Sequence, residues 1–328
     1  MEKVMQSRID VNKSPFDLST FWGRVKHYAW VTDPRLTILS TKQLNESRDL
    51  LDKYRKGEED PGTTEHEVRK AQQQYLSAFH PDTGDLQNVV GRMSFQVPGG
   101  MVLIGAMITF YKSNTAVIFW QWANQSFNAL VNYTNSNATS EVNTKQLVTA
   151  YVSATSSALV VALGLKRYLH TRASPLMQRF VPFAAVAAAN AVNIPLMRQN
   201  ELLDGVTLMD EKGESVIKSK YAALKGISQV VTARICMATP SMTLLPVFME
   251  RLEKTRTFRR HTWLGGICQV LFSGMILLVT VPVSCAIFPQ KCSISSDKLN
   301  ILDHKRVEEL KQAGRMTLPA TLYFNKGL

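Results

Sequence analysis

Long apolar stretches dominate the sequence after residue 97, whereas the first 96 residues mix apolar positions with 14 acidic and 14 basic ones. A helix needs roughly 20 residues to cross a hydrocarbon core of about 30 Å. Five stretches come close to or exceed that length, at residues 97–122, 147–165, 180–197, 227–249 and 263–288. A soluble fold could not cover five runs with so little charge in one chain, so buried helices of a soluble core are disfavoured. The pattern therefore predicts an all-α fold, a helical membrane protein with about five membrane-spanning helices.

The first of these stretches is interrupted. Lys112, Ser113 and Asn114 break its apolar character, and the segment QWANQSFN at residues 121–128 has helical spacing but is too polar to face lipid. The sequence leaves open whether this stretch forms one broken helix or two separate pieces.

The N-terminal part has the pattern of a helical hairpin. Ser40 with Gln43 and Thr64 with Glu67 are two capping boxes, each followed by apolar residues at helical spacing. The glycine-containing segment 57–62 separates the two helices. We therefore expect a soluble helical domain before the spans. The predicted division is an N-terminal domain at 1–96, a transmembrane domain at 97–290 and a C-terminal tail at 291–328.

Charge indicates how the spans are oriented. The chain carries 38 Lys and Arg against 26 Asp and Glu, and the excess is concentrated in short segments between apolar stretches. Segment 166–179 holds four bases and no acid, and segment 250–260 holds five bases and two acids. Basic loops favour the side that is not translocated. With five spans, this places the N-terminal domain and both basic loops on the inside face, cytosol or matrix, and the C-terminal tail on the opposite face.

Several classes of protein are disfavoured. The basic residues are not clustered with aromatic readers on a folded domain, so we expect no nucleic-acid partner. The four cysteines form no CxxC pair and His and Cys are not grouped at ligand spacings, so we expect no metal and no other cofactor. The first residues lack the apolar core of a secretory signal, and their acids argue against a mitochondrial presequence. Any organelle address is then internal.

Polar side chains inside the spans are the candidate functional residues. No Asp or Glu lies in any of the five stretches, which argues against a proton or sodium pump. Arg234 is the only charged residue inside the last four, and its partner could be a backbone carbonyl, a lipid phosphate, the membrane interface or an anionic ligand. Amides recur at helical spacing, and each alone could be a contact between helices. Together they favour a polar cavity, and the predicted substrate-binding residues are Arg234, Asn124, Asn128, Asn190 and Asn193.

One motif precedes the spans, His80-Pro81-Asp82-Thr83-Gly84. Its Asp-Thr-Gly triplet is shared with aspartic peptidases, but a second triplet and an apolar strand leading into it are missing. Its His-Pro-Asp triplet is shared with the loop of J-domain co-chaperones, but little room remains for the closing helix. The third interpretation is a structural turn, in which Pro81 fixes φ and Asp82 caps the next residues of the chain.

The whole chain resembles the sideroflexins, multi-span proteins of the mitochondrial inner membrane. The matching motifs are TDPR at 32–35, AFHPDTG at 78–84, FWQW at 119–122, NQSFNA at 124–129, VNYT at 131–134, RFVPFAAVAAAN at 179–190, NIPLMR at 193–198, FPQ at 288–290 and YFNKGL at 323–328. The resemblance is strongest to the subgroup that carries serine for one-carbon metabolism. It implies an inner-membrane location, a matrix-facing N-terminal domain, a tail in the intermembrane space, and serine as cargo, with alanine and cysteine as further substrates.

The resulting hypothesis is a carrier and not an enzyme. Serine would enter a polar cavity lined by Arg234 and the amides, and would cross by facilitated transport or exchange. The expected partners are this small-molecule substrate and membrane lipid, and the sequence assigns no oligomeric state. The alternative is a membrane scaffold or assembly factor for respiratory complexes, or for iron or haem handling, acting through the N-terminal domain.

Overall fold

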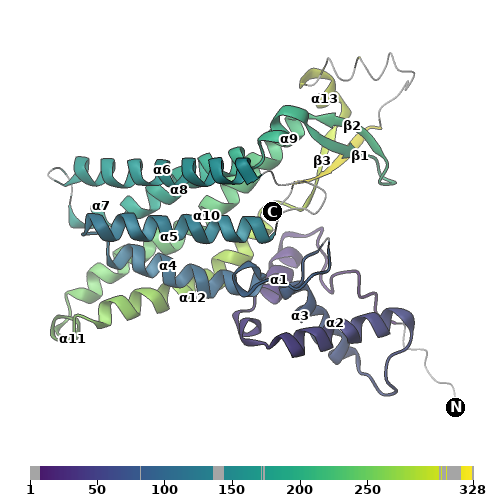
Figure 1. The fold of residues 1–328 in the computed structure, drawn as a ribbon, viewed down its shortest axis with the longest axis horizontal. Helices are drawn as coiled ribbons and strands as arrows, with labels where there is room; N and C mark the ends of the chain where they lie inside the picture. Colours follow the sequence, from purple (N-terminus) through teal and green to yellow (C-terminus); the bar gives the residue numbers. More distant parts are fainter. Residues whose placement is uncertain are drawn as a thin grey trace.

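The computed structural model describes residues 8–81, 83–135, 144–170, 172, 174–302, 304, 308 and 319–326. A bundle of long helices forms its body, and two smaller lobes extend from one end of this bundle (Figure 1). One lobe is built from the N-terminal helices. The other combines a small β-sheet with segments from the middle and the end of the chain.

The N-terminal lobe confirms the predicted helical hairpin. Both capping boxes form, with the side chains of Ser40 and Thr64 accepting from the backbone N–H groups of Gln43 and Glu67. The two helices pair through buried apolar residues along their facing sides. The elements of the lobe are α1 (Phe21–Val31), the 3₁₀ helix η1 (Pro34–Ile38), α2 (Thr41–Lys56) and α3 (Glu65–Ala78). Two further 3₁₀ turns lead into the bundle, η2 (Val89–Gly91) and η3 (Met93–Phe95).

The bundle contains four helices that are long and apolar enough to cross a membrane, at Lys145–Leu169, Leu176–Met197, Lys220–Glu253 and Leu264–Ala286. They correspond to the second to fifth predicted spans. The bundle helices are α4 (Gln96–Thr109), α5 (Asn114–Thr134), α6 (Thr144–Leu169), α7 (Pro175–Gln178), α8 (Val181–Met197), α10 (Lys220–Glu253), α11 (Arg256–Arg260) and α12 (Leu264–Ala286).

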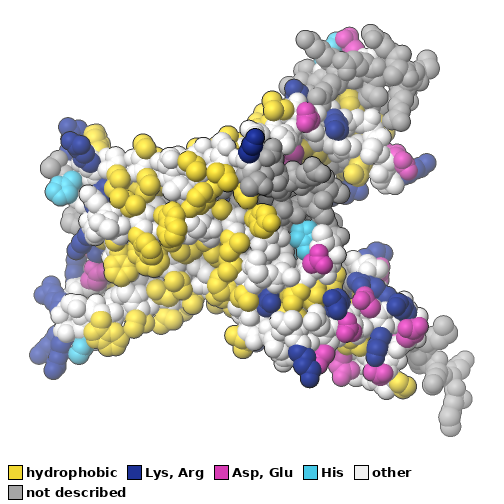
Figure 2. All heavy atoms as spheres, in the orientation of Figure 1, with side chains coloured by type: hydrophobic (Ala, Val, Ile, Leu, Met, Phe, Trp, Pro, Cys, Tyr) yellow, Lys and Arg dark blue, Asp and Glu magenta, His cyan; other side chains and the backbone are white. Residues whose placement is uncertain are grey.

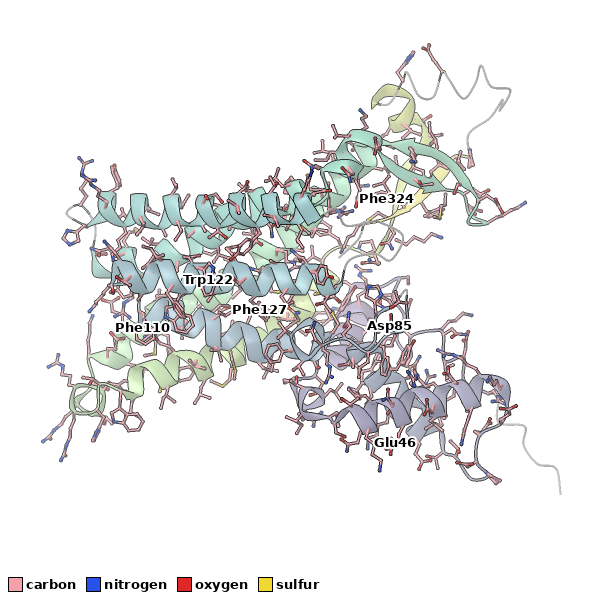
Figure 3. The ribbon with its side chains drawn as sticks, in the orientation of Figure 1. Glu46, Asp85, Phe110, Trp122, Phe127 and Phe324 are labelled. Atoms are coloured by element: carbon pink, nitrogen blue, oxygen red, sulfur yellow. The ribbon has the colours of Figure 1, made fainter. Side chains whose placement is uncertain are left out.

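The first predicted span is two antiparallel helices, α4 and α5. The ring of Phe95 lies 6.2 Å from that of Phe127, and the ring of Phe110 stacks on Trp120 at 6.1 Å. The two helices are therefore in contact both near the turn and near the open end of the hairpin. Figure 3 shows Phe110 near the turn of this hairpin and Phe127 further along α5. The break falls at residues 110–113, where Ser113 caps α5 by accepting from the N–H of Ala116. Of the two possibilities that the sequence left open, two pieces is correct.

The α4–α5 hairpin reaches the end of the bundle that carries the basic loops. The ammonium of Lys166, near the end of α6, donates to the carbonyl of Lys112 and, at 2.6 Å, to Oδ1 of Asn114. The hairpin turn therefore lies beside basic segment 166–179. Segment 250–260 lies at the same end, because Arg179 pairs with Glu253. The helices that run along the bundle are α4, α5, α6, α8, α10 and α12 (Figure 1).

Both lobes lie at one end of the bundle (Figure 1). Arg24 of α1 donates to the carbonyl of Ala286 at the C-terminal end of α12, and α1 packs along α12. Helix α12 begins just after basic segment 250–260, so the N-terminal lobe lies at the end opposite the basic loops. The sequence analysis expected this lobe and the basic loops to share a face, with the C-terminal tail opposite. In the structure the lobe and the loops lie at opposite ends of the bundle, and the membrane face of each end stays a prediction.

Two described segments of the predicted C-terminal tail are strands of a small sheet. Antiparallel strands are arranged in the order β2-β1-β4-β3. They are β1 (Val206–Met209), β2 (Ser215–Ser219), β3 (Lys291–Ser295) and β4 (Thr321–Asn325), flanked by α9 (Gln199–Asp204) and α13 (Ser296–Leu302). Phe324 of β4 packs against Gly226 near the start of α10 (Figure 3). The all-α class is confirmed, and the small sheet is a minor addition that the sequence did not predict.

Apolar side chains cover the outside of the bundle. Val160 of α6, Leu244 of α10 and Val279 of α12 are all exposed. Figure 2 shows hydrophobic side chains along the helices of the bundle, with Lys and Arg gathered at its ends and on the lobes. Such a surface matches lipid in the middle and water at both ends. The chain is a membrane protein.

Candidate functional site

The polar side chains of α5 lie on one face of the helix. Gln121, Asn124, Gln125, Asn128 and Asn132 follow one another at intervals of three or four residues. The first three are buried, and Gln121 is only 1% exposed. Among the described residues, Oε1 of Gln121, Nδ2 of Asn124 and Nε2 of Gln125 have no hydrogen-bond partner. Because a buried amide without a partner is costly, this polar face is suited to water or a polar ligand.

Local contacts hold the C-terminal end of α5 in place. The helix ends at Asn135, whose side-chain amide donates to the carbonyl oxygens of Gly91 and Val131. Gly91 has room for no side chain, since a Cβ there would lie 2.2 Å from the methyl group of Thr134. This close approach locks α5 onto the turn η2 and fixes the direction of its polar face.

Arg234 of α10 lies at the C-terminal end of the polar face of α5. Its Nη2 donates to Oδ1 of Asn132 over 3.3 Å. Within the part of the chain that the structure describes, no carboxylate pairs with Arg234. A guanidinium whose only acceptor is a neutral oxygen still has N–H groups that can donate to an anion. The structure thus brings Arg234 into contact with Asn132 of α5, a residue outside the predicted set.

The two predicted amides of α8, Asn190 and Asn193, lie at about the same depth in the bundle as Arg234. Asn193 is buried, and Asn190 is half-buried. Val186 and Ile194, one turn before and after Asn190, pack in apolar clusters with residues of α10. The α10 partners of Ile194 end one turn before Arg234. Asn190 therefore lies on the face of α8 that meets α10, at about the level of Arg234.

Further cations surround the Arg234 end. Arg24 donates to three backbone carbonyls, and the buried ammonium of Lys326 donates to the carbonyl of Phe288 over 2.8 Å. Burial lowers the pKa of Lys326, and the neighbouring thiols of Cys285 and Cys292 oppose this change. Arg198 pairs with Glu201 and also donates to the carbonyl of Lys326. This end of the bundle is therefore positive and is suited to attract carboxylates.

A small pocket lies at the other end of α5. Buried Gln121 lines it together with Tyr111, Trp120, Lys166 and Gln178. Its volume is about 10 Å³, which is room for about one water molecule. An amino acid could enter only after the surrounding helices move. The predicted set omitted Gln121 and Gln125, although both continue the spacing of Asn124 and Asn128.

The His80 motif forms a turn at the end of α3. His80 is buried, and its Nδ1 accepts from the backbone N–H of Thr83 over 3.3 Å. Gly84, at φ +71°, donates its N–H to the carbonyl of His80. Pro81 lies within this turn, and Asp82 lies outside the described residues. A buried imidazole held in this way is not displayed to a partner protein, so the turn interpretation fits best.

Within the described ranges, no group of three or more His, Cys, Asp or Glu side chains could hold a metal ion. All four cysteines are free.

Fold and site together define a multi-pass helical membrane protein with a polar face inside its bundle. The model of the family described as sideroflexins matches residues 10–328, so the chain belongs to the sideroflexin family. It is 52% identical over 320 residues to sideroflexin-2 of Drosophila melanogaster, covering 98% of each chain. It is 47% identical to human sideroflexin-3, again covering 98% of each, and 47% identical to mouse sideroflexin-1 over both full lengths. No solved structure matches the chain.

Membership of this family supports a role of the transporter type in mitochondria, of the carrier kind and not the enzymatic kind. Relatives with three different numbers fall within 47–52% identity, so similarity alone assigns neither a subgroup nor a substrate.

Proposed function

We propose that the protein carries small neutral amino acids, serine foremost, across the mitochondrial inner membrane by facilitated transport or exchange. The observation that carries this proposal is the buried amide face of α5, which has unpartnered polar atoms and ends at Arg234. A zwitterion needs donors for its carboxylate and acceptors for its ammonium and hydroxyl groups. The guanidinium of Arg234 supplies the first, and the oxygens of Asn128, Asn190 and Asn132 supply the others.

Sidedness follows from the charge of the loops. The basic segments 166–179 and 250–260 favour the matrix. The N-terminal lobe and the sheet would then face the intermembrane space, which reverses the orientation that the resemblance implied for the N-terminal domain. Substrate from that side would meet the positive end of the bundle around Arg234 first.

The test is uptake of labelled serine into vesicles that hold the purified protein. We expect uptake above that of empty vesicles, and a loss of about tenfold or more for Arg234→Gln, since a charge-assisted contact contributes about 1.5–3 kcal/mol. Arg251→Gln is the matched control, because Arg251 is an exposed arginine near the end of the same helix. Uptake equal to that of empty vesicles would refute the carrier. Equal loss in both variants would refute the role of Arg234.

A scaffold role remains the second candidate because of one feature of the N-terminal lobe. Trp22 and Ile38 are exposed to 68% and 87%, although both are large and apolar. Deleting the lobe would not isolate this role, since α1 packs along α12. Trp22→Ser with Ile38→Ser is cleaner: a scaffold would lose its co-purifying complexes while serine uptake stays unchanged, and a carrier without a scaffold role would lose neither.

A further inference from the structure

We propose that Lys166 and Gln121 form a second station for the substrate, at the end of α5 opposite Arg234. This inference rests on the proposed carrier function and adds a binding site on the side of the basic loops. The ligand class is a small zwitterion with a carboxylate, bound through that carboxylate by Lys166 and through an N–H or O–H donor by Gln121.

The first observation is the pocket between the hairpin, α6 and the start of α8. Gln121 and Lys166 both line it, and Gln121 is almost completely buried. Oε1 of Gln121 has no partner among the described residues. A buried acceptor without a donor in a pocket is a position that a ligand's ammonium or hydroxyl group can fill.

The second observation is the bonding of Lys166. Its ammonium donates to the carbonyl of Lys112 and to Oδ1 of Asn114, which are both neutral oxygens. An ammonium has three donors, so these two contacts leave one N–H for a ligand. In the part of the chain that the structure describes, Lys166 forms no ion pair. Its charge is therefore available to a carboxylate.

The amide face of α5 connects the two stations. Eleven residues separate Gln121 from Asn132, the partner of Arg234, which corresponds to about 16 Å along a helix. Between them, Asn124, Gln125 and Asn128 present a polar group at every turn. A carboxylate leaving Arg234 therefore has a continuous polar path to Lys166. Lys166 would be the first cation of basic segment 166–179 that it meets.

The pocket is closed around this station. Its volume of about 10 Å³ leaves room for about one water molecule. The ring of Tyr111 lines the pocket, and the guanidinium of Arg179 lies 5.8 Å from the centre of that ring. Opening the second station thus requires the hairpin turn to move away from α8.

Transport separates this inference from a structural role of Lys166. In vesicles, Lys166→Gln should raise KM for serine about tenfold, as expected for the loss of one charge-assisted contact. Lys166→Arg keeps the charge and should restore KM. Lys112→Gln is the matched control, because this exposed lysine of the same turn contributes only its backbone carbonyl. A KM equal to that of the unchanged protein in Lys166→Gln overturns the second station and leaves the carrier function untouched.

Substrate protection tests binding without transport. Lys166→Cys is treated with a methanethiosulfonate reagent, and the unchanged protein gives the background from its four cysteines. Serine should slow modification of Cys at this position, whereas ethanolamine, which lacks the carboxylate, should not. Equal rates with and without serine overturn the second station. Protection by serine in vesicles that show no uptake would support the station and refute the carrier instead.

Discussion

Arg179 and Glu253 join two segments that are 74 residues apart in sequence. Two parallel contacts connect the guanidinium to the carboxylate, at 2.5 and 3.3 Å. Arg179 lies at the junction of α7 and α8, and Glu253 is the last residue of α10. The arginine side chain is 11% exposed and also lies over the ring of Tyr111. The pair therefore ties α8, α10 and the hairpin turn together at the end of the basic loops.

Removing this carboxylate should destabilise that end. We expect Glu253→Ala to lower the free energy of unfolding by about 1–3 kcal/mol, because it leaves a largely buried guanidinium without its charged partner. Thermal unfolding of the purified protein in detergent measures the change.

Glu250→Ala is a closely matched control. Its side chain is 38% exposed against 37% for Glu253, but it pairs only with exposed Lys254 in the same helix. We expect a loss below about 0.5 kcal/mol for this control. Similar losses in the two variants would show that the contact between helices adds nothing to stability.

The close contact of α4 with α12 depends on Gly105. A Cβ at this position would lie 2.7 Å from Cγ2 and 2.8 Å from Cα of Val270, so the backbone of α12 would have to move. We expect Gly105→Ala to cost about 1–3 kcal/mol, as overpacking does. The melting temperature in detergent reports the cost.

Gly164→Ala supplies the comparison. Nothing lies within 4 Å of a Cβ at Gly164, which is inside α6. Alanine has the higher helix propensity, so this variant should be unchanged or more stable by up to about 1 kcal/mol. If Gly105→Ala melts no lower than Gly164→Ala, close packing at Gly105 is not what holds α4 to α12.

Local patterns account for the parts of the fold that were predicted. Ser40 and Thr64 marked helix starts because their caps use neighbouring residues only. The sequence left open whether α4 and α5 are one helix or two, because α4 is only 14 residues long and α5 is too polar to read as a span. The sheet escaped because β1 pairs with β4 across more than 100 residues, and its strands are four or five residues long. Pairing over such distances leaves no local signal.

The candidate site likewise combines features that have a local sequence signal with contacts that depend on packing. Helical spacing puts Asn124 and Asn128 of the predicted set on one face, and the same rule includes Gln121, Gln125 and Asn132. The contact of Arg234 with Asn132 needs the packing of two helices whose residues are 102 apart. The neutral partners of Lys166 were equally inaccessible, since they depend on the hairpin turn. The sequence therefore shows which residues share a helix face, but it does not show which residues they contact.

Stability should depend on pH through His27 of α1. Burial lowers the pKa of this imidazole from 6.5, and Ser14 Oγ lies 3.0 Å from its Nδ1. The unfolded chain therefore binds a proton at a higher pH than the folded one. The contribution of neutral His27 is complete above pH 6.5 and is lost as the pH falls from 6.5 toward the folded pKa.

Melting temperatures between pH 5 and 7.5 measure this dependence. The unchanged protein should lose stability below pH 6.5, and His27→Gln should reduce the slope. Carboxyl groups such as Asp33, whose pKa is lowered by contact with Arg35, act in a more acidic range. His66→Gln, on the exposed side of α3, is the control and should keep the original slope. An unchanged slope in His27→Gln would remove His27 as the cause.

Both lobes should be accessible from the same side of the membrane. They share one end of the bundle because Arg24 contacts Ala286 and Arg198 contacts Lys326, whereas Arg179 and Glu253 mark the other end. In mitochondria stripped of their outer membrane, trypsin should remove an epitope at the N-terminus and cut near the sheet. It should spare the arginines of segment 250–260 until detergent is added. Cleavage in that segment with both lobes protected would reverse the proposed orientation but keep the fold. Cleavage of one lobe with protection of the other would contradict the placement of both lobes at one end of the bundle.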